Sequence, residues 1–554
     1  MNELPTADCY SIDVAPGLHR LFLDYCAGNA GALRFYASES AGSGPGGGSA
    51  IAPDGWQSRP PIPSHWPGLL RLLAEQNPSP AAEPALRALG KGAGTVLTGQ
   101  QVGLFGGPLF TPYKAATAVA RARQATTAGR PHAAIFWLAT EDHDFAEINH
   151  VTFPARRELR KLVYANAPTA TQPVGGVMLD DSIAALVEQA GELVGASDAM
   201  EALAAAYKPG RTFAQAFGEF YRKAFAAQGL LVLDASGRAA HRMGAPALRA
   251  GLERADELHT ALVERSRELE AAGYHAQVAV GPQSSLLFLI DEGTGARLAL
   301  KRLPPSAEEP AGLWLTSDSS GRKSYSTADL LGILETEPER ISPSALLRPV
   351  FQDFLLSTSA TIGGPAEIAY FAQSAVLFER ILGRFTPVLP RFSATLIEPA
   401  IGDLLRKHVL TLERVFAAGQ PDALAKLLAE RTMPIEGKER LAAADAALEG
   451  ELTALLEWMG GLDAGLARSG ETAAGKIRYQ MNRLRTLAAD FQLQREASLG
   501  KQAEAICQAL YPGGVLQERL HGAAFYFARY GFELAETLVA QADRSCPGHM
   551  ALWL

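Results

Sequence analysis

Short apolar runs alternate with helical patterns between residues 95 and 399. The runs TVL, AIFWLA, LLVLDA, HAQVAV, LLFLID and RLALKR each have the length and composition of a buried strand, and helical segments separate several of them. Such alternation favours an α/β fold, with a mostly parallel sheet covered by helices. Residues 180–228 are rich in Ala, Leu and Glu, which predicts a helical insertion within this domain.

The strand pattern stops after Thr386 to Pro399, and the residues that follow are helical in pattern. Apolar residues recur at steps of three and four from Leu441 to Leu462, and again from Ile477 to Phe491. These two near-heptad seams, separated by the run ARSGETAAG, predict an antiparallel helical hairpin. Two interpretations stay open: an ordinary packed helical subdomain, or an arm whose apolar seam forms a dimer.

Composition narrows the class of protein. The chain has 554 residues, of which 47% are hydrophobic and 20% charged, as in a soluble globular protein of several domains. Its net charge of -8 gives no basic stripe, so we expect no nucleic-acid partner. No apolar window is long enough to span a membrane, and Met1 to Asp8 lacks the features of a signal peptide, so we expect a cytoplasmic protein.

The four cysteines are widely spaced and form no C-x-x-C pair. They are Cys9, Cys26, Cys507 and Cys546. This spacing indicates neither a disulfide framework nor a zinc ribbon, and it predicts four buried or incidental thiols. Residues 1–90, which include a Gly/Ser-rich run at 38–50, are assigned to an N-terminal arm that packs on the core.

A glycine-rich run, VLTGQQVGLFGGPLFTPYK, joins the first strand of the α/β domain to a helix. At such a turn backbone N–H groups converge and the helix dipole favours an anion, although the run matches neither common phosphate-loop pattern and a generic turn is the alternative. A lysine inside the helix favours the anionic ligand. The binding residues predicted here are Thr98, Gly99, Gln100, Gln101, Gly106 and Lys114.

Acidic residues surround a histidine at the end of the next strand, in the run WLATEDHDFAEINH. The carboxyl ends of parallel strands face the ligand crevice of an α/β sheet, so a solvated polar turn is the less favoured interpretation. A histidine beside three carboxylates is expected to have a raised pKa and to act as a general acid or base. The predicted catalytic residues are Glu141, Asp142, His143 and Asp144, with Asn149 as a binding residue.

The same run raises the question of a metal site. If a helix begins at or before Asp144, then His143, Glu147 and His150 share one face at spacings i, i+4 and i+7. That spacing permits metal binding, but no second cluster of His or Cys supplies further ligands. We therefore predict no protein-held metal.

A third run, LLRPVFQDFLLSTSATIGGPAEIAYFAQ, contains a Gly-Gly-Pro turn that opens a helix. Its glycines allow a ligand to approach the backbone, and an arginine precedes the turn, so a carboxylate could be held by side chain and backbone together. An ordinary helix N-terminus is the alternative. The binding residues predicted here are Arg348, Gly363, Gly364 and Glu367.

These three runs, together with GYHAQVAV, TPVLPRFSATLIEP and LQERLHGAAFYFARYG, resemble the bacillithiol-biosynthesis cysteine-adding enzymes, a family of cysteine ligases. The matches keep the same order from about residue 95 to 532. The resemblance implies a Rossmann-like catalytic core at 91–399, a coiled-coil dimerisation domain at 400–510 and a segment at 511–554 that returns to the core.

The resemblance also implies a reaction. The protein would add L-cysteine to glucosaminyl-malate in the last step of bacillithiol biosynthesis, with ATP activating the carboxylate and Mg²⁺ accompanying the nucleotide. If the carboxylate is activated as an adenylate, we infer that Thr98 to Gln101 contact phosphates and that His143 or Asp142 orients the amine or takes its proton.

A second adenine-nucleotide site (ATP or ADP) is implied between the coiled coil and the core, where an aromatic packing seam is the alternative. Its residues would be Leu396, Ile397, Glu398, Tyr511, Arg519 and Tyr526. Two other functions remain open: an adenylate-forming or nucleotidylyltransferase-like enzyme that acts on another amine and acid, and a non-catalytic coiled-coil scaffold with a nucleotide-binding core.

Overall fold

The computed structural model describes residues 6–36, 60–155, 158–168, 171–303, 312–318, 321–496, 498–544 and 546–554. The Gly/Ser-rich run at 38–50 lies outside these residues. The chain divides into two compact units, of which the first comprises Met1–Ala155, Arg160–Ala394 and Glu518–Met550. The second comprises Thr395–Gln517 with two short flanking pieces, Arg156–Leu159 and Ala551–Leu554.

The first unit contains a five-stranded parallel sheet in the order β13-β12-β2-β3-β6. Its strands are β2 (Gly94–Gln101), β3 (His132–Ala139), β6 (Leu231–Asp234), β12 (Thr358–Gly363) and β13 (Val388–Pro390). The chain builds outward from β2 in one direction through β3 and β6, and later in the other direction through β12 and β13. The predicted Rossmann-like core is confirmed, and its strand order reverses between β2 and β12.

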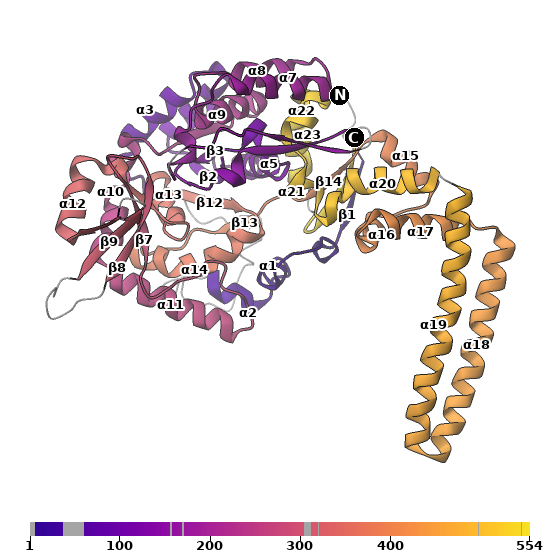
Figure 1. Ribbon diagram of the computed structural model, residues 1–554. Coiled ribbons are helices and arrows are strands. Elements are labelled where there is room, and N and C mark those ends of the chain that lie inside the picture. The colour runs from indigo at the N-terminus through magenta and orange to yellow at the C-terminus, as the bar shows by residue number, and fades with distance from the viewer. Residues whose placement is uncertain are drawn as a thin grey trace. The chain divides into compact units, whose positions relative to one another are not determined.

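Helices cover both faces of this sheet (Figure 1). Alternate residues of β3 point to opposite faces, so neighbouring side chains of this strand contact different helices. Phe136 stacks on Tyr221 of α9 (Phe213–Ala224), with ring centroids 5.0 Å apart. Trp137 meets Phe351 of α13 (Arg348–Leu356) edge-on, at 6.1 Å.

Further helices of the first unit lie in the N-terminal arm and in the segment 180–228, where a helical insertion was predicted. The N-terminal arm supplies α1 (Arg20–Cys26), α2 (Ala30–Leu33), α3 (Trp66–Gln76) and α4 (Glu83–Gly90), whose buried side chains belong to the same apolar core as β3. Three helices lie within 180–228, namely α7 (Ser182–Val194), α8 (Asp198–Ala206) and α9. The remaining long helices are α5 (Phe110–Thr127), α10 (Arg238–Glu253), α11 (Ala255–Ala271), α14 (Pro365–Leu382) and α23 (Glu533–Asp543).

A second, antiparallel sheet also lies in the first unit, in the order β10-β9-β8-β7-β11. Its strands are β7 (Ser284–Ile290), β8 (Arg297–Leu303), β9 (Leu313–Asp318), β10 (Gly321–Tyr325) and β11 (Ile341–Pro343). The prediction that LLFLID and RLALKR belong to the parallel sheet is therefore wrong. Six residues separate β7 from β8, too few for the crossover that a parallel pair needs.

The run HAQVAV was also expected to form a strand, and it does not. The side chain of Gln373 replaces a strand neighbour there: its Oε1 accepts from the N–H of Val278 at 2.9 Å, and its Nε2 donates to the carbonyl of the same residue at 2.8 Å. A side chain from α14 thus satisfies the backbone groups that a sheet would otherwise pair.

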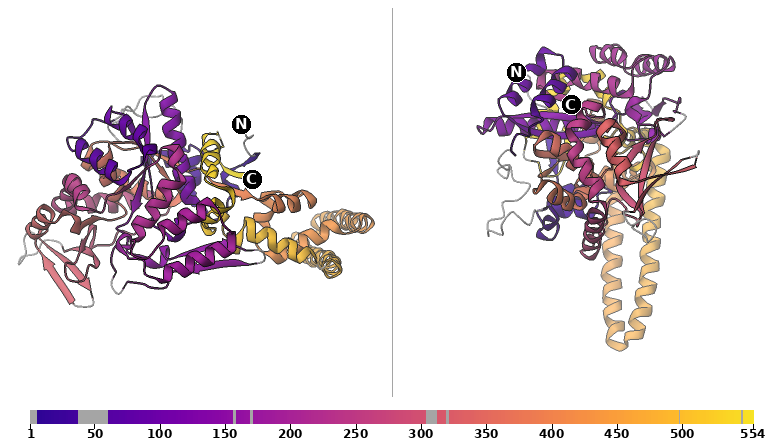
Figure 2. Two further views of the ribbon diagram at one scale, coloured as in Figure 1. Left: turned by 90° about the horizontal axis from the view of Figure 1, so that it is seen from above. Right: turned by 90° about the vertical axis from the view of Figure 1, so that its left-hand side faces the viewer.

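The second unit is helical and is dominated by an antiparallel hairpin of α18 (Ile435–Leu462) and α19 (Ala464–Arg495), which lie side by side in Figures 1 and 2. The predicted coiled-coil domain is confirmed, but the position of its turn is not. The turn is at Asp463, whose carboxylate accepts from the N–H groups of Gly465 and Leu466 at 2.7 and 2.9 Å. The run ARSGETAAG lies inside α19, because this capping residue starts the second helix earlier.

Shorter helices precede and follow the hairpin in the second unit. They are α15 (Pro399–Lys407), α16 (Leu412–Ala418), α17 (Pro421–Thr432) and α20 (Ser498–Leu510). No helix among the described residues is long and apolar enough to cross a membrane.

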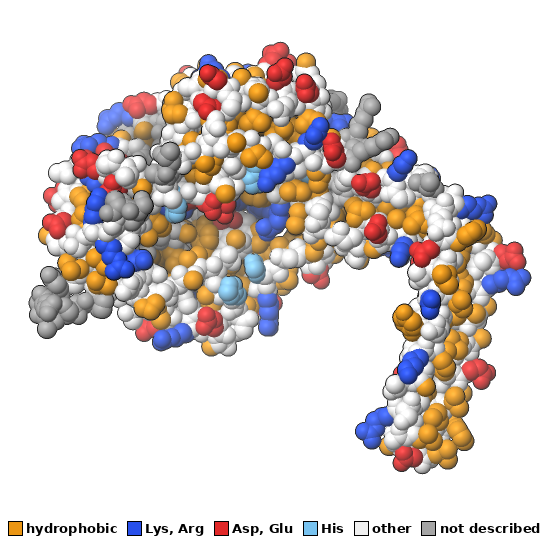
Figure 3. Space-filling model, viewed as in Figure 1, with side chains coloured by type: hydrophobic (Ala, Val, Ile, Leu, Met, Phe, Trp, Pro, Cys, Tyr) orange, Lys and Arg blue, Asp and Glu red, His pale blue; other side chains and the backbone are white. Residues whose placement is uncertain are grey.

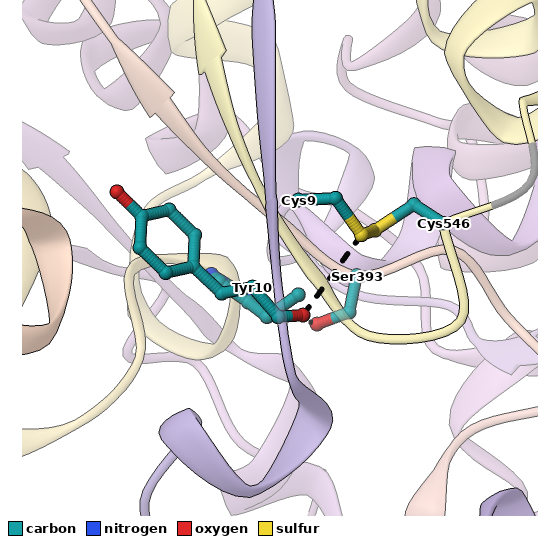
Figure 4. The surroundings of a disulfide bond; sticks show 5 residues. Cys9, Tyr10, Ser393 and Cys546 are labelled. Carbon is teal, nitrogen blue, oxygen red and sulfur yellow. Dashed lines mark hydrogen bonds between the residues drawn. A yellow bond between two sulfur atoms is a disulfide. The ribbon is translucent and has the colours of Figure 1, made fainter.

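The prediction of four separate thiols is wrong for two of them. Cys9 in β1 (Ala7–Tyr10) forms a disulfide with Cys546, and the two lie 537 residues apart in sequence (Figure 4). No local spacing could indicate this pair, since the fold brings the two ends of the chain together. Cys26 and Cys507 are free, and burial raises the pKa of their thiols to about 12 and about 11.

Candidate active site

A cavity of about 400 Å³ lies at the carboxyl edge of the parallel sheet, where the strand order reverses between β2 and β12. The end of β2 lines one side, and the first turn of α14 lines another. Open α/β sheets bind their ligands at such a reversal. Of the residues predicted in the three runs, those that line this cavity are Thr98, Gly99, Gln100, Gln101, Lys114, Asp142, Arg348, Gly364 and Glu367.

The glycine-rich run contributes to this cavity through its two ends, and the glycines in its middle do not line it. At Gly99 a Cβ would come within 3.1 Å of the carbonyl oxygen of Trp137, so glycine lets β2 and β3 approach closely. Gly106 lies outside the cavity lining. Its N–H donates to the hydroxyl of Tyr207 at 3.0 Å, and its carbonyl accepts from the hydroxyl of Tyr221 at 2.8 Å. Gly106 therefore anchors the loop to two buried tyrosines and does not line the ligand cavity.

Lys114 is buried, and its ammonium group already has three acceptors. It donates to the carbonyl of Gly99 at 3.1 Å, to Oε1 of Gln100 at 2.8 Å and to the carboxylate of Glu367. These contacts use all three of its N–H groups, so the lysine links β2 to α14. We expected Lys114 to bind an anionic ligand, but no N–H group is left for one. Burial lowers the pKa of Lys114 even with Glu367 beside it.

Asp142 and Arg348, which both line the cavity, form a bidentate ion pair. Arg348 donates from Nη1 to Oδ2 at 3.0 Å and from Nη2 to Oδ1 at 2.6 Å. Burial alone would raise the pKa of Asp142, but Arg348 outweighs it and the pKa lies below its ordinary value. This carboxylate is therefore a poor acceptor for a catalytic proton.

His143 faces an arginine that sequence analysis did not find. Nη1 of Arg297 on β8 lies 3.2 Å from Nδ1 of His143. The guanidinium of Arg297 also lies over the ring of Phe288, 3.7 Å from the ring centroid. Burial first, and then Arg297, lowers the pKa of His143, so the expected raised pKa is wrong. An arginine only donates, so Nδ1 accepts and the neutral ring carries its proton on Nε2. His143 is absent from the cavity lining.

The other site residues predicted in this run, Glu141, Asp144 and Asn149, have structural partners and do not line the cavity. Glu141 lies 3.0 Å from Nε2 of the buried His241; burial alone would lower the pKa of that histidine, but Glu141 outweighs it and the pKa is raised. Asp144 caps the short helix α6 (Phe145–Ile148). Asn149 donates to the carbonyl of Tyr164 at 3.1 Å.

The helical spacing needed for a metal site is not formed. Helix α6 ends at Ile148, and His150 begins the strand β4 (His150–Pro154). Consequently His143, Glu147 and His150 do not share a helix face. Within the described ranges, no group of three or more His, Cys, Asp or Glu side chains is placed to hold a metal ion.

Three further charged groups line the cavity: Glu147, Arg391 and Arg519. Arg391 forms a buried ion pair with Glu518, in which Nη1 donates to Oε2 at 3.0 Å. In the part of the chain that the structure describes, Arg519 has no acidic partner, and Glu147 is held only by Nε2 of Gln101 at 2.8 Å. The cavity therefore contains one guanidinium and one carboxylate that the protein itself does not neutralise.

Two family models cover most of the chain. Residues 65–392 match the model described as "Bacillithiol biosynthesis BshC, N-terminal Rossmann-like domain". Residues 394–553 match "Bacillithiol biosynthesis BshC, C-terminal coiled-coil domain". The chain belongs to the BshC family. The resemblance seen in the sequence is thereby confirmed.

Individual relatives agree with the family models. A BshC protein of Koribacter versatilis, named "Putative cysteine ligase BshC", is 40% identical and covers 98% of this chain and 99% of its own length. A BshC protein of Solibacter usitatus with the same name is 35% identical over 88% of this chain and 90% of its own length. The BshC family is therefore one of ligases.

The residues assigned to a second nucleotide site fall in both units of this BshC chain. In the second unit, Leu396 exchanges two backbone hydrogen bonds with the side chain of Gln517, at 2.8 and 2.9 Å, and Tyr511 lies beside Phe416. Ile397 is buried at the end of β14 (Ala394–Ile397), and Glu398 precedes α15.

In the first unit, Tyr526 is buried, with its hydroxyl 2.9 Å from Nδ1 of His521. Arg519, which we had placed in the second site, lines the cavity at β2 and β12 instead. The second site remains a prediction.

Two of the missed residues differ in how they could have been found. Arg391 directly follows β13, so the rule that drew attention to the end of β3 applies equally to it. Arg297 carries no such signal, since it reaches His143 from the antiparallel sheet, whose separate existence the sequence pattern did not show.

Proposed function

We propose that this protein joins L-cysteine to glucosaminyl-malate by an amide bond in the last step of bacillithiol biosynthesis, with ATP activating the carboxylate. The observation that carries the proposal is Arg519, the cavity-lining guanidinium without an acidic partner among the described residues. The other three cations that line the cavity, Lys114, Arg348 and Arg391, each have a carboxylate partner. An anionic ligand would supply the missing partner of Arg519.

The first turn of α14 supports the same conclusion. This helix has 18 residues, and its residues Pro365, Ala366 and Glu367 line the cavity. The N–H groups of Ala366 and Glu367 have no acceptor within the helix, and they lie at the positive end of its dipole. Phosphates of ATP, or the carboxylates of malate or cysteine, fit such a position, and Mg²⁺ would accompany the nucleotide.

Activation is required because a carboxylate is a poor electrophile. ATP supplies a good leaving group on the carboxyl carbon, as phosphate or as AMP. In this scheme Arg519 and the N–H groups of α14 hold the charged groups of the ligand. The ion pairs of Lys114 and Arg348 keep the walls of the cavity in place around it.

We also propose that the protein is a cytoplasmic homodimer that pairs through α18 and α19. Apolar side chains lie along the face of the hairpin that Figure 3 shows. Among the exposed ones are Leu455, Trp458, Leu462, Leu484, Leu487 and Phe491. A second copy of the hairpin would cover this seam, as in other coiled coils.

The reaction is tested by mass spectrometry of mixtures of the purified protein with glucosaminyl-malate, L-cysteine, Mg²⁺ and ATP. We expect bacillithiol in the complete mixture and none when ATP is omitted. Arg519→Ala should raise the KM of an anionic substrate at least tenfold, about 1.4 kcal/mol, and Arg519→Lys should restore part of the affinity. Absence of product from the complete mixture would refute the proposed reaction, and product without ATP would refute its activation step.

A further inference from the structure

The carboxylates around the cavity differ in their partners. Asp142, Glu147 and Glu367 line it. Asp142 is paired with Arg348, and Glu367 with Lys114. Within the described part of the chain no lysine or arginine pairs with Glu147, so this residue carries the one cavity-lining carboxylate without a cation.

A neutral group holds Glu147 in place. Nε2 of Gln101 donates to its Oε2 at 2.8 Å and points also toward Oδ2 of Asp142, at 3.4 Å. These two contacts fix the NH₂ group of Gln101 toward the acids and leave Oε1 of Glu147 open to a donor from a ligand. An amide neutralises no charge, so the carboxylate retains its attraction for a cation.

The histidine that we expected to serve as the base is less well placed. Its Nδ1 faces Arg297, and His143 does not line the cavity. Asp142 is likewise bound on both oxygens by Arg348. Glu147 is exposed at the cavity, so it can also exchange a proton with water.

From this geometry we infer that Glu147 binds the amino group of the acceptor and takes its proton as the amide forms. This inference rests on the proposed function. It assigns the two unpaired charges of the cavity to the two kinds of group on the ligands, with Arg519 for an anion and Glu147 for the ammonium.

The bound ammonium gives one proton to Glu147, which passes it to water, and the free amine then attacks the activated carbonyl carbon. The N–C bond forms while the C–O bond to phosphate or AMP breaks, and the leaving group departs with the electron pair. The second proton on nitrogen goes to Glu147, which leaves a neutral amide.

Binding gives the first test. Isothermal titration would compare glucosaminyl-malate with N-acetylglucosaminyl-malate, which lacks the positive charge, on the wild type, Glu147→Gln and Glu188→Gln. Glu188 is an exposed residue of α7 outside the cavity lining and controls for the loss of one charge. We expect Glu147→Gln to weaken binding of the amine at least tenfold and to leave that of the acetylated ligand unchanged. Equal effects on both ligands, or none on either, would overturn the inference.

Hydroxylamine separates the acyl transfer from the activation step. Hydroxylamine is uncharged at neutral pH. It can therefore attack an activated carboxyl group without a protein carboxylate that binds its nitrogen. Glu147→Gln should retain ATP-dependent formation of cysteine hydroxamate but should lose about 100-fold or more in kcat for the amide product.

The outcomes distinguish two failures. If Glu147→Gln forms the amide at the wild-type rate, the inference is wrong and the proposed function stands. If the wild type forms neither hydroxamate nor amide and binds neither ligand, the proposed function fails and the inference fails with it.

Discussion

Replacing Lys114 by Met should destabilise the parallel sheet domain strongly, because it removes the only cation paired with Glu367 among the described residues. Removing one partner of a buried ion pair costs roughly 3 to 5 kcal/mol, since the other charge is left without compensation. The side chain of Lys114 is 2% exposed and that of Glu367 is 26% exposed, so water screens the carboxylate in part. We therefore expect a loss near the lower end, about 3 kcal/mol.

Urea unfolding followed by tryptophan fluorescence measures this loss, with the double variant Lys114→Met, Glu367→Gln as the matched control. The neutral pair has no orphaned charge, so the double variant should recover at least half of the stability lost in the single one. If the single and double variants unfold at the same urea concentration, the loss comes from packing around residue 114 and our electrostatic reasoning is refuted.

The pH dependence of the same variants gives the sign of the effect. Burial would raise the pKa of Glu367, but Lys114 outweighs it and the folded-state pKa lies below the ordinary value. The pair therefore stabilises the protein above the unfolded-state pKa, and this contribution is lost as the pH falls through the folded-state pKa. The difference between wild type and Lys114→Met should shrink at acidic pH. A difference that stays constant down to acid unfolding would contradict this account.

Three further predictions concern other parts of the chain. Arg297→Gln should raise the NMR titration midpoint of His143, because it removes the nearest cation, and an unchanged midpoint would show that the contact has no electrostatic effect. Cys9→Ser should lower the free energy of unfolding by about 2 to 4 kcal/mol and make it insensitive to reductant, whereas wild-type stability that ignores reductant would argue against the disulfide. Asp463→Ala should cost the hairpin about 1 kcal/mol, measured as a lower melting temperature of the helical circular-dichroism signal, and no change would exclude the capping role.

Local patterns were sufficient for three strands of the parallel sheet, whereas β12 lies where the sequence predicted only a turn before a helix. The runs at β2, β3 and β6 are short, apolar and followed by turn residues, and the polar run after β3 lies at the carboxyl edge as the parallel topology requires. These predictions depend on residues that are close in sequence. The cavity at β2 was found for the same reason, since its first wall is the continuation of one strand.

Partners that are distant in sequence explain the errors. A six-residue connection turned β7 and β8 into a separate antiparallel hairpin, and Gln373 bound the backbone where a strand was expected. Asp463 set the hairpin turn in place of a glycine-containing run. In each case a single hydrogen-bonding group or a short loop outweighed a hydrophobic pattern that was itself correctly identified.

The charges of the site show most clearly what sequence could not supply. Residue types predicted an anion-binding site, and Lys114 and Arg348 were the natural candidates because they lie in the conspicuous runs. Both are neutralised by acids that folding brings to them, Glu367 and Asp142. Of the charged groups that line the cavity, only Arg519, from a segment after the coiled coil, and Glu147 have no charged partner among the described residues. We therefore expect a charged residue in a conspicuous run to indicate where the site lies, and the absence of an internal counter-ion to indicate which group binds the ligand.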